Sequence, residues 1–295
     1  MSEAHRTRMR ELIDTPRATL LPGATDALTA RVVEQLGFDA VYLSGAGFAN
    51  AQLGVPDLGL VSLSEIALQT ERLRDAVNIP IVVDGDTGFG GPLNVMRTVR
   101  LLERRGASAV QLEDQEFPKR CGHFEGKSVV SATEMVARIS AAVDARDDEN
   151  FVVIARTDAR AIDGLSAAID RAHLYRETGA DVLFVEASES REEIEAVAKE
   201  LPGPLLINIV EGGKTPMLGI DELEALGYSL VLYANSAMRA GIHGVQHVLR
   251  SLLENGSTAE VLDSMLSWED RQALVDKPAF DLLEKRYDEI AEGTR

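Results

Sequence analysis

Eight short apolar runs recur along the 295-residue chain and constrain its fold more than any other feature. They cover residues 19–21, 40–43, 79–83, 109–112, 151–155, 182–185, 205–209 and 230–233. Most are separated by helix-like segments with apolar residues three and four positions apart, such as 95–102, 135–143 and 167–175. Continuous apolar strands that alternate with helices are typical of a parallel sheet buried on both faces. Eight such repeats predict a closed (β/α)8 barrel of the TIM type.

An open, doubly wound sheet is the alternative fold, but no dinucleotide-binding glycine fingerprint follows the first run. A (β/α)8 barrel runs to about 250 residues as one domain, so we expect residues 1–295 to form a single domain. Within it, residues 236–295 contain amphipathic helical patterns and predict a C-terminal helical extension. This extension either caps the barrel or docks on a neighbouring subunit.

Composition and charge exclude several classes of partner. The formal net charge of −18 argues against a nucleic-acid partner, because the phosphates would be repelled. The single cysteine excludes an intramolecular disulfide, so nothing points to an oxidising compartment. No apolar run approaches the roughly 20 residues that a membrane-spanning helix needs, and the polar residues 1–6 do not resemble a secretory signal. We therefore expect a cytoplasmic protein without a membrane partner.

The only cysteine, Cys121, stands between Lys119 and Arg120 on one side and His123 on the other. Neighbouring cations lower the pKa of a thiol, and two glycines, one of them Gly122, favour a loop over a helix interior. A lone cysteine is more often a small buried hydrophobic residue. The basic neighbours argue against that alternative and favour a reactive thiol.

Polar residues follow most of the apolar runs, at the positions where a barrel gathers its functional side chains. Converging carboxylates raise one another's pKa unless a cation compensates, and oxygen ligands with few histidines suit Mg²⁺. Arginines beside a metal indicate an anionic substrate. The set is Ser44, Gly45, Asp84, Asp86, Glu113, Asp114, Arg156, Asp158, Glu186, Asn208, Glu211, Asn235 and Arg239.

Single members of this set have simpler alternatives. Asp57 or Asp114 could be only a helix N-cap, as aspartate often is where a strand ends. Arg156 could only pair with Asp158, and Glu186 could only support a neighbouring side chain. The combination of acids, amides and arginines at the strand ends favours a functional site over these separate explanations.

Six segments together resemble the isocitrate lyase/phosphoenolpyruvate mutase superfamily. They are residues 42–45, 83–90, 112–115, 119–123, 154–159 and 211–216. The resemblance extends from about residue 8 to residue 290. It implies a (β/α)8 barrel whose last helix is swapped between subunits, Mg²⁺ dependence, and a dimer of dimers, so we expect a homotetramer.

The resemblance also implies roles for individual residues. Asp84 and Asp86 would bind Mg²⁺, one of them directly and the other through water, with Mn²⁺ as a substitute, and Asp57 would act through water. Arg156 matches the arginine that grips the α-oxo acid, and residues 44–46 match a cradle for the substrate carboxylate. The implied catalytic residues are Cys121 as general acid/base, Glu113, Lys119 and His123. The implied substrate contacts are Tyr42, Ser44, Gly45, Ala46, Gly122, Arg156, Glu186, Asn208 and Arg239.

Several positions bear on which branch of the superfamily the chain resembles. Residues 124–127 look more like the dimethylmalate and carboxyphosphonoenolpyruvate groups. Val210 replaces a threonine usual in methylisocitrate lyases, and Trp268 stands in the region where they place a substrate arginine. That loss counts against a tricarboxylate, although Arg271 lies close enough to compensate. Ala159 does not match the serine associated with oxaloacetate hydrolases.

The sequence therefore predicts a Mg²⁺-dependent carbon–carbon lyase that cleaves a 2-hydroxy dicarboxylate, such as 2,3-dimethylmalate or a related alkylmalate. The products would be an α-oxo acid such as pyruvate and a carboxylic acid. Mg²⁺ would polarise the oxygens of the oxo-acid unit and stabilise the enolate, and Cys121 would protonate the enolate carbon. Methylisocitrate lyase and a phosphonomutase are the alternative enzymes, and a catalytically silent binding protein is the alternative outside the enzymes.

Overall fold

The computed structural model describes residues 4–120, 122 and 126–293, which belong to two units. The first unit is Met1–Met238 and the second is Arg239–Arg295. All eight strands lie in the first unit, and the described elements of the second are helices. The organisation as a single domain with an extension from residue 236 stays a prediction.

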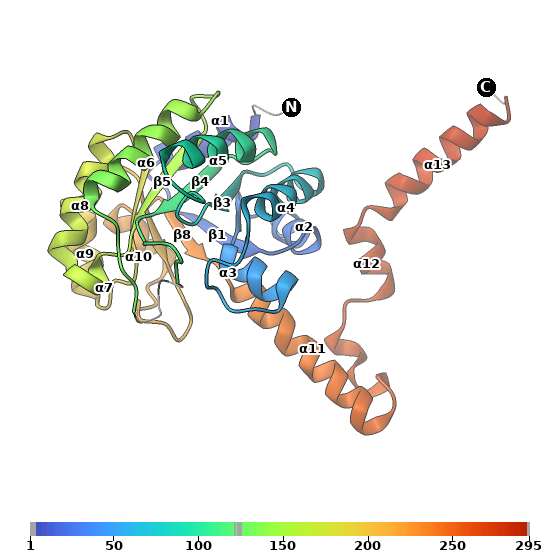
Figure 1. Cartoon of the computed structure of the whole chain (residues 1–295). Helices are drawn as coiled ribbons and strands as arrows, with labels where there is room; N and C mark the ends of the chain where they lie inside the picture. Colours follow the sequence, from blue (N-terminus) through green and yellow to red (C-terminus); the bar gives the residue numbers. More distant parts are fainter. Residues whose placement is uncertain (1–3, 121, 123–125, 294–295) are drawn as a thin grey trace. The chain divides into compact units, whose positions relative to one another are not determined.

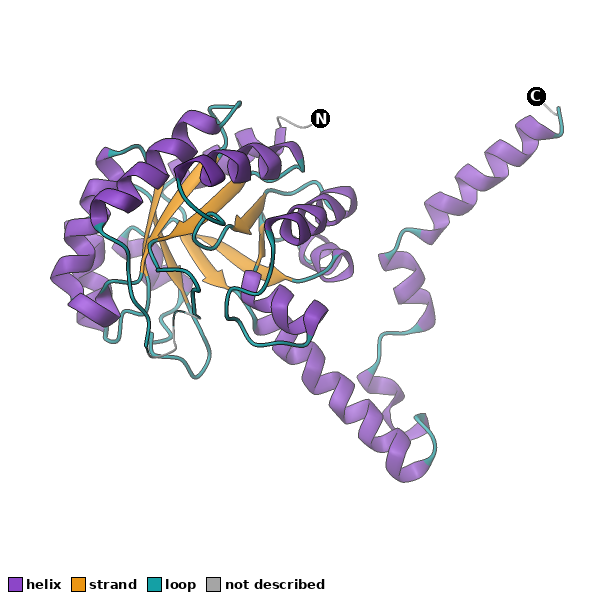
Figure 2. Cartoon of the chain, in the orientation of Figure 1, coloured by secondary structure: helices purple, strands orange, loops and turns teal. Residues whose placement is uncertain are grey.

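Eight parallel strands close into a barrel, because each strand pairs with the next along the chain and the last pairs with the first. Figure 2 shows these strands, in orange, enclosed by purple helices. The predicted (β/α)8 fold is therefore confirmed. The strands are β1 (Thr19–Ala24), β2 (Val41–Leu43), β3 (Ile81–Asp84), β4 (Ala109–Glu113), β5 (Val152–Thr157), β6 (Val182–Val185), β7 (Leu205–Asn208) and β8 (Leu230–Tyr233).

Helices follow the strands along the chain and cover the outside of the barrel (Figure 1). The longer ones start at side-chain caps such as Ser62, Ser131 and Ser190, whose hydroxyls accept a backbone N–H three residues on. The helices of the first unit are α1 (Ala4–Asp14), α2 (Ala27–Gln35), α3 (Gly45–Phe48), α4 (Leu63–Ala76), α5 (Pro92–Arg104), α6 (Ala132–Ala145), α7 (Arg160–Asp163), α8 (Leu165–Glu177), α9 (Arg191–Glu200) and α10 (Ile220–Leu226), with a π-helix at Ala49–Leu53.

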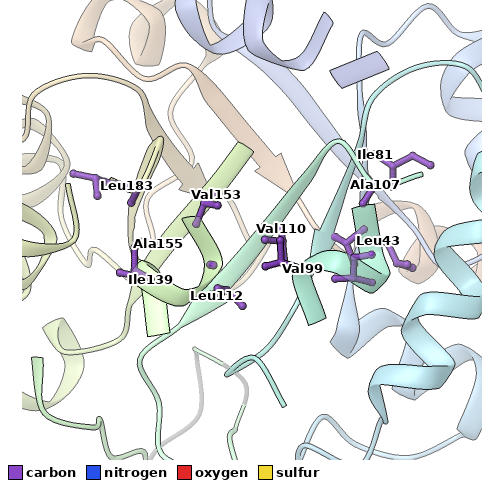
Figure 3. Packing of buried hydrophobic residues seen from close by; sticks show 14 of the residues in the cluster. Leu43, Ile81, Val99, Ala107, Val110, Leu112, Ile139, Val153, Ala155 and Leu183 are labelled. Carbon is purple, nitrogen blue, oxygen red and sulfur yellow. The ribbon is translucent and has the colours of Figure 1, made fainter. Parts of the chain in front are cut away.

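The strands are buried on both faces, as their continuous apolar sequences require. Every residue of β3, β4, β5 and β6 is buried. One face of each strand joins a core cluster shared with the helices. Figure 3 shows Val110 and Leu112 of β4, Val153 and Ala155 of β5, and Ile139 of α6 in this cluster.

The other strand faces form a second core cluster inside the barrel, and helix α1 completes it. Met9, Leu12 and Ile13 of α1 belong to this cluster together with alternate residues of the strands. Arg10 of α1 donates a 2.7 Å hydrogen bond to Asp181, the residue directly before β6. Helix α1 therefore lies at the amino ends of the strands, and the carboxyl ends remain for a functional site.

The second unit exposes much apolar surface on its helices. Leu253 is 86% exposed, Leu282 is 71% exposed and Trp268 is 69% exposed. Docking on a neighbouring subunit would cover such surface, and the swapped helix stays a prediction. In the described part of the chain, no helix is both long and apolar enough to span a membrane. The helices here are α11 (Ser236–Asn255), which begins in the first unit, a 3₁₀ helix (Ala259–Ser264), α12 (Trp268–Leu274) and α13 (Lys277–Ala291).

A substitution at Gly23 of β1 tests how tightly β1 packs against the end of β8, where the barrel closes. A Cβ atom here would overlap the backbone carbonyl of Ala234, which cannot rotate away as a side chain could. We expect Gly23→Ala to lower the Tm by roughly 2–12 °C, because overpacking costs about 1–3 kcal/mol. Gly219→Ala is the matched control, since a Cβ there meets nothing within 4 Å. Equal Tm values for the two variants in thermal unfolding would contradict this packing argument.

Candidate active site

A cavity of about 120 Å³ lies at the carboxyl ends of the barrel strands. Seven strands contribute to its wall, from Tyr42 on β2 to Leu232 on β8. The loop after β4 adds Lys119, Arg120 and Gly122. The wall consists of Tyr42, Ser44, Ala46, Asp57, Asp84, Glu113, Lys119, Arg120, Gly122, Arg156, Phe184, Glu186, Asn208, Val210, Leu232, Ala234 and Asn235.

The cavity brings together most of the site residues that the sequence predicted. Gly45 and Asp86 are outside the wall but touch it, since the Gly45 N–H donates to Asp84 and Asp86 contacts Lys119. Arg239 belongs to the second unit, so its predicted substrate contact stays a prediction. Cys121 and His123 lie outside the described residues, and their predicted catalytic roles also stay predictions.

Asp84, the last residue of β3, and Asp86, two residues further on, form a buried acidic pair. The Asp84 carboxylate accepts the backbone N–H of Asp86 at 3.2 Å on one oxygen and that of Gly45 at 3.1 Å on the other. A Cβ on Gly45 would lie 3.1 Å from the Asp84 carboxylate, so glycine allows the start of α3 to approach this closely. Asp86 has a φ of 47°, a left-handed conformation that costs a non-glycine residue free energy and is often retained at functional sites.

Lys119 is the cation that accompanies this acidic pair. Its Nζ lies 2.6 Å from Asp57 Oδ1 and 2.7 Å from Asp86 Oδ1. Burial raises the pKa of Asp86 to about 7, although Lys119 opposes that rise. Burial also disfavours the charged lysine, but Asp86 and Glu113 outweigh it and raise the pKa of Lys119 above its ordinary value. Lys119 is therefore protonated at neutral pH and holds negative charge in place.

Arg156, in β5, is the second buried cation. Its guanidinium makes a two-pronged contact with Asp158, at 2.9 and 3.0 Å. The ion pair that was the simpler alternative for Arg156 thus exists. The same guanidinium nevertheless reaches the cavity, where Nη1 lies 3.3 Å from Glu113 and 3.4 Å from Glu186, and it stacks 5.4 Å from the ring centre of Phe184.

The acidic residues fit a hard divalent cation. Burial raises the pKa of Glu113 well above its ordinary value, although Arg156 opposes the rise. Among the described residues, Glu113 Oε1 is buried and has no hydrogen-bond partner. No group of three or more His, Cys, Asp or Glu side chains in the described residues is arranged to hold a metal alone. Mg²⁺ needs only one or two carboxylates and keeps several waters, so Asp84 and Asp86 suffice for it.

The sequence left open that Asp57 or Asp114 is only a helix N-cap, and the structure shows that this alternative is wrong. Neither Asp57 nor Asp114 is an N-cap, because α4 is capped by Ser62 and α6 by Ser131. Asp114 instead accepts the Thr157 hydroxyl at 2.7 Å and is fully buried. It supports the end of β5, and Asp57 supports Lys119.

Lys127 and Gln115 are buried site partners that the sequence analysis did not find. Lys127 Nζ lies 2.8 Å from Asp158 Oδ1 and also donates to the carbonyl of Gly122. The Gln115 side chain donates to the carbonyl of Arg120 at 2.8 Å and accepts its N–H at 2.9 Å. The signal in the sequence was their place in the segments 112–115 and 124–127, which resemble the family but gave neither residue a role. Loop residues of this kind have no periodicity that would reveal their contacts.

Comparison with known proteins identifies the superfamily. The sequence model of the phosphoenolpyruvate phosphomutase family matches residues 9–253. The chain belongs to this family. A 2,3-dimethylmalate lyase of Eubacterium barkeri is 43% identical over 263 residues, which cover 89% of this chain and 91% of that protein. A 2-methylisocitrate lyase of Aeropyrum pernix is 42% identical over 287 residues, which cover 93% and 92%.

Solved structures of family members have the same fold. A crystal structure of 2,3-dimethylmalate lyase, a member of the PEP mutase/isocitrate lyase superfamily, superposes with a TM-score of 0.90 at 33% identity, covering 96% of this chain and 95% of that one. A phosphonopyruvate hydrolase in complex with oxalate and Mg²⁺ superposes with a TM-score of 0.87 at 31% identity, covering 96% and 99%. The predicted superfamily is confirmed, and the chain is a carbon–carbon lyase.

Asp84→Asn tests the metal site with little change of shape. The amide keeps one oxygen for a backbone N–H but loses the charge that a divalent cation requires. We expect Mg²⁺ affinity, measured by calorimetry, to fall at least about tenfold, since one charge-assisted contact is worth about 1.5–3 kcal/mol. EDTA should abolish turnover of the unmodified protein. Asp144→Asn, on the exposed face of α6, is the matched control. Full turnover in EDTA, or equal Mg²⁺ affinity of both variants, would rule out the metal site.

Proposed function

We propose that the protein is a Mg²⁺-dependent lyase that cleaves 2,3-dimethylmalate or a related alkylmalate into an α-oxo acid, such as pyruvate, and a carboxylic acid. The observation that carries the proposal is the composition of one small cavity. Its wall combines the Arg156 guanidinium with the Asp84 carboxylate and with apolar side chains of Phe184, Val210 and Leu232. Cationic groups suit the carboxylates of the substrate, and the apolar wall suits its alkyl groups.

Each protein group has a limited role in this reaction. Arg156 binds the carboxylate of the oxo-acid unit, and Ser44 with its neighbours at 45–46 cradles it at the start of α3. Ser44 and Ala46 line the cavity there, and the Gly45 N–H donates to the Asp84 carboxylate. Mg²⁺ held by Asp84 and Asp86, with Mn²⁺ as a substitute, would supply positive charge for the oxygens of the oxo-acid unit. Tyr42, whose pKa burial raises well above its ordinary value, stays a neutral hydroxyl in the wall.

The cleavage breaks one carbon–carbon bond of the substrate and needs two proton transfers, and its atoms and electrons balance. A carboxylate of the cavity wall takes the proton of the substrate hydroxyl as general base, and the hydroxyl oxygen becomes the carbonyl oxygen of the α-oxo acid. The electron pair of the broken carbon–carbon bond stays on the carboxylic-acid fragment. The carbon of that fragment then takes a proton from the Cys121 thiol, which acts as the general acid. A cytoplasmic homotetramer, a dimer of dimers, is the assembly that accompanies this proposal.

Cys121→Ser tests the proton donor. A hydroxyl has nearly the shape of a thiol, but its pKa is several units higher, so it exchanges a proton poorly at neutral pH. We expect kcat to fall by more than about two orders of magnitude while the affinity for oxalate in the presence of Mg²⁺ changes little. Near-normal kcat for the cleavage would remove the thiol from the mechanism and assign Cys121 a structural role.

A substrate panel tests the alkylmalate assignment against methylisocitrate. Trp268 stands where a methylisocitrate lyase would supply an arginine, and Arg271 stacks on its ring at 4.2 Å from the centre. Loss of one charge-assisted contact costs about 1.5–3 kcal/mol, or roughly ten- to more than a hundredfold. We expect kcat/KM for 2,3-dimethylmalate to exceed that for methylisocitrate by at least about tenfold, measured by pyruvate release. A preference for methylisocitrate would overturn this assignment and point to Arg271 as the replacement anchor.

A further inference from the structure

Lys127 is a buried cation with no part in the reaction described above. Its side chain is only 2% exposed, and its Nζ lies 2.8 Å from Asp158 Oδ1. The same Nζ donates to the backbone carbonyl of Gly122. A lysine ammonium loses its hydration when it is buried, so such a group is retained only where its contacts compensate that loss. Lys127 therefore connects the Asp158 side chain with the backbone of Gly122.

The first point is the ion pair that holds Arg156. Both oxygens of Asp158 already accept hydrogen bonds from Arg156, and the Asp158 side chain is fully buried. Burial disfavours the charged Asp158 carboxylate, but Arg156 and Lys127 together keep its pKa below the ordinary value. Glu113 and Glu186 also lie near the guanidinium. Without Lys127, three carboxylates would surround a single cation, and little positive charge would remain for an anionic substrate.

The second point is the backbone of Gly122, which lies directly against Arg156. A Cβ atom on Gly122 would overlap Arg156 Nη2 and would lie 2.7 Å from Glu186 Cγ. The peptide at Gly122 thus limits where the guanidinium can sit. Because Lys127 donates to the Gly122 carbonyl, it fixes the same guanidinium from the backbone side.

We propose that Lys127 is a positioning residue: through Asp158 and the Gly122 carbonyl it holds the Arg156 guanidinium in place and leaves it positive enough to bind the oxo-acid unit. The proposal rests on the proposed role of Arg156 as the group that grips this unit. Lys127 itself does not line the cavity. Its effect on ligand binding must therefore act through Arg156.

Calorimetric titration with oxalate in saturating Mg²⁺ tests this role, because oxalate is a small dianion whose binding requires no turnover. We expect Lys127→Met to raise the Kd of oxalate at least about tenfold and to raise KM more than it lowers kcat. Lys127→Arg should recover a large part of the oxalate affinity, since it restores the charge, though in a different geometry. Lys199→Met, on the exposed face of α9, is the matched control and should bind oxalate as the unmodified protein does.

Other outcomes would overturn the proposal. A folded Lys127→Met variant with an oxalate Kd within twofold of the unmodified protein would contradict it. A lowered Tm with an affinity loss that arginine does not rescue would assign Lys127 a merely structural role. Should Lys127→Met fail to fold, Lys127→Gln, which keeps a donor but no charge, must show the same loss of oxalate affinity.

The oxalate experiment also separates this inference from the substrate assignment. If the unmodified protein binds oxalate in a Lys127-dependent way but cleaves no alkylmalate, the positioning role stands and the substrate is wrong. If the unmodified protein cleaves an alkylmalate but does not bind oxalate, the role of Arg156 and the inference about Lys127 both fail.

Discussion

Opposite charges buried together at one end of the barrel are the interaction on which the rest of the site depends. A lone carboxylate in this environment would cost several kcal/mol and would take up a proton instead. Lys119 offsets Asp57 and Asp86, and Arg156 offsets Glu113. The acids are therefore kept close to a cavity that small anions must enter. The acidic groups outnumber the basic ones, and a divalent cation would neutralise the negative charge that remains.

The backbone makes this concentration of charge sterically possible. Gly45 allows the start of α3 to come within reach of Asp84, and Gly122 allows the loop after β4 to lie on Arg156. Gly85 lets the end of β3 approach β4 closely, since a Cβ there would lie 2.9 Å from the carbonyl oxygen of Gln111. Helix α1 at the amino ends of the strands leaves the carboxyl ends for these close approaches. The apolar core inside the barrel and the charged site at the carboxyl ends of the strands thus occupy different levels along the barrel axis.

The fold was predictable because it follows from a repeated local pattern. The run at residues 151–155 became β5, Val152–Thr157, and the pattern at 95–102 became most of α5, Pro92–Arg104. Strand ends were predictable for the same reason, which is why Arg156 was found. The contacts that hold Arg156 were not predictable. Lys127, for example, lies in a loop, where the spacing of residues indicates neither burial nor side-chain orientation. Its 2% exposure depends on two tertiary contacts that only the folded chain brings together.

The charged groups and the apolar groups of this cavity recognise different parts of a substrate. The carboxylates and cations at the strand ends suit any small acid with an α-oxo unit, so they cannot distinguish one alkylmalate from another. Discrimination must come from groups that differ in size rather than charge, such as Val210 and Phe184 in the wall. An extra methylene in an apolar pocket is worth only about 1–3 kcal/mol, whereas an unpaired buried charge costs more. The site therefore specifies the class of substrate strongly and its alkyl group more weakly. A change from one alkylmalate to another then needs few substitutions, and those substitutions belong in the apolar wall rather than among the buried charges.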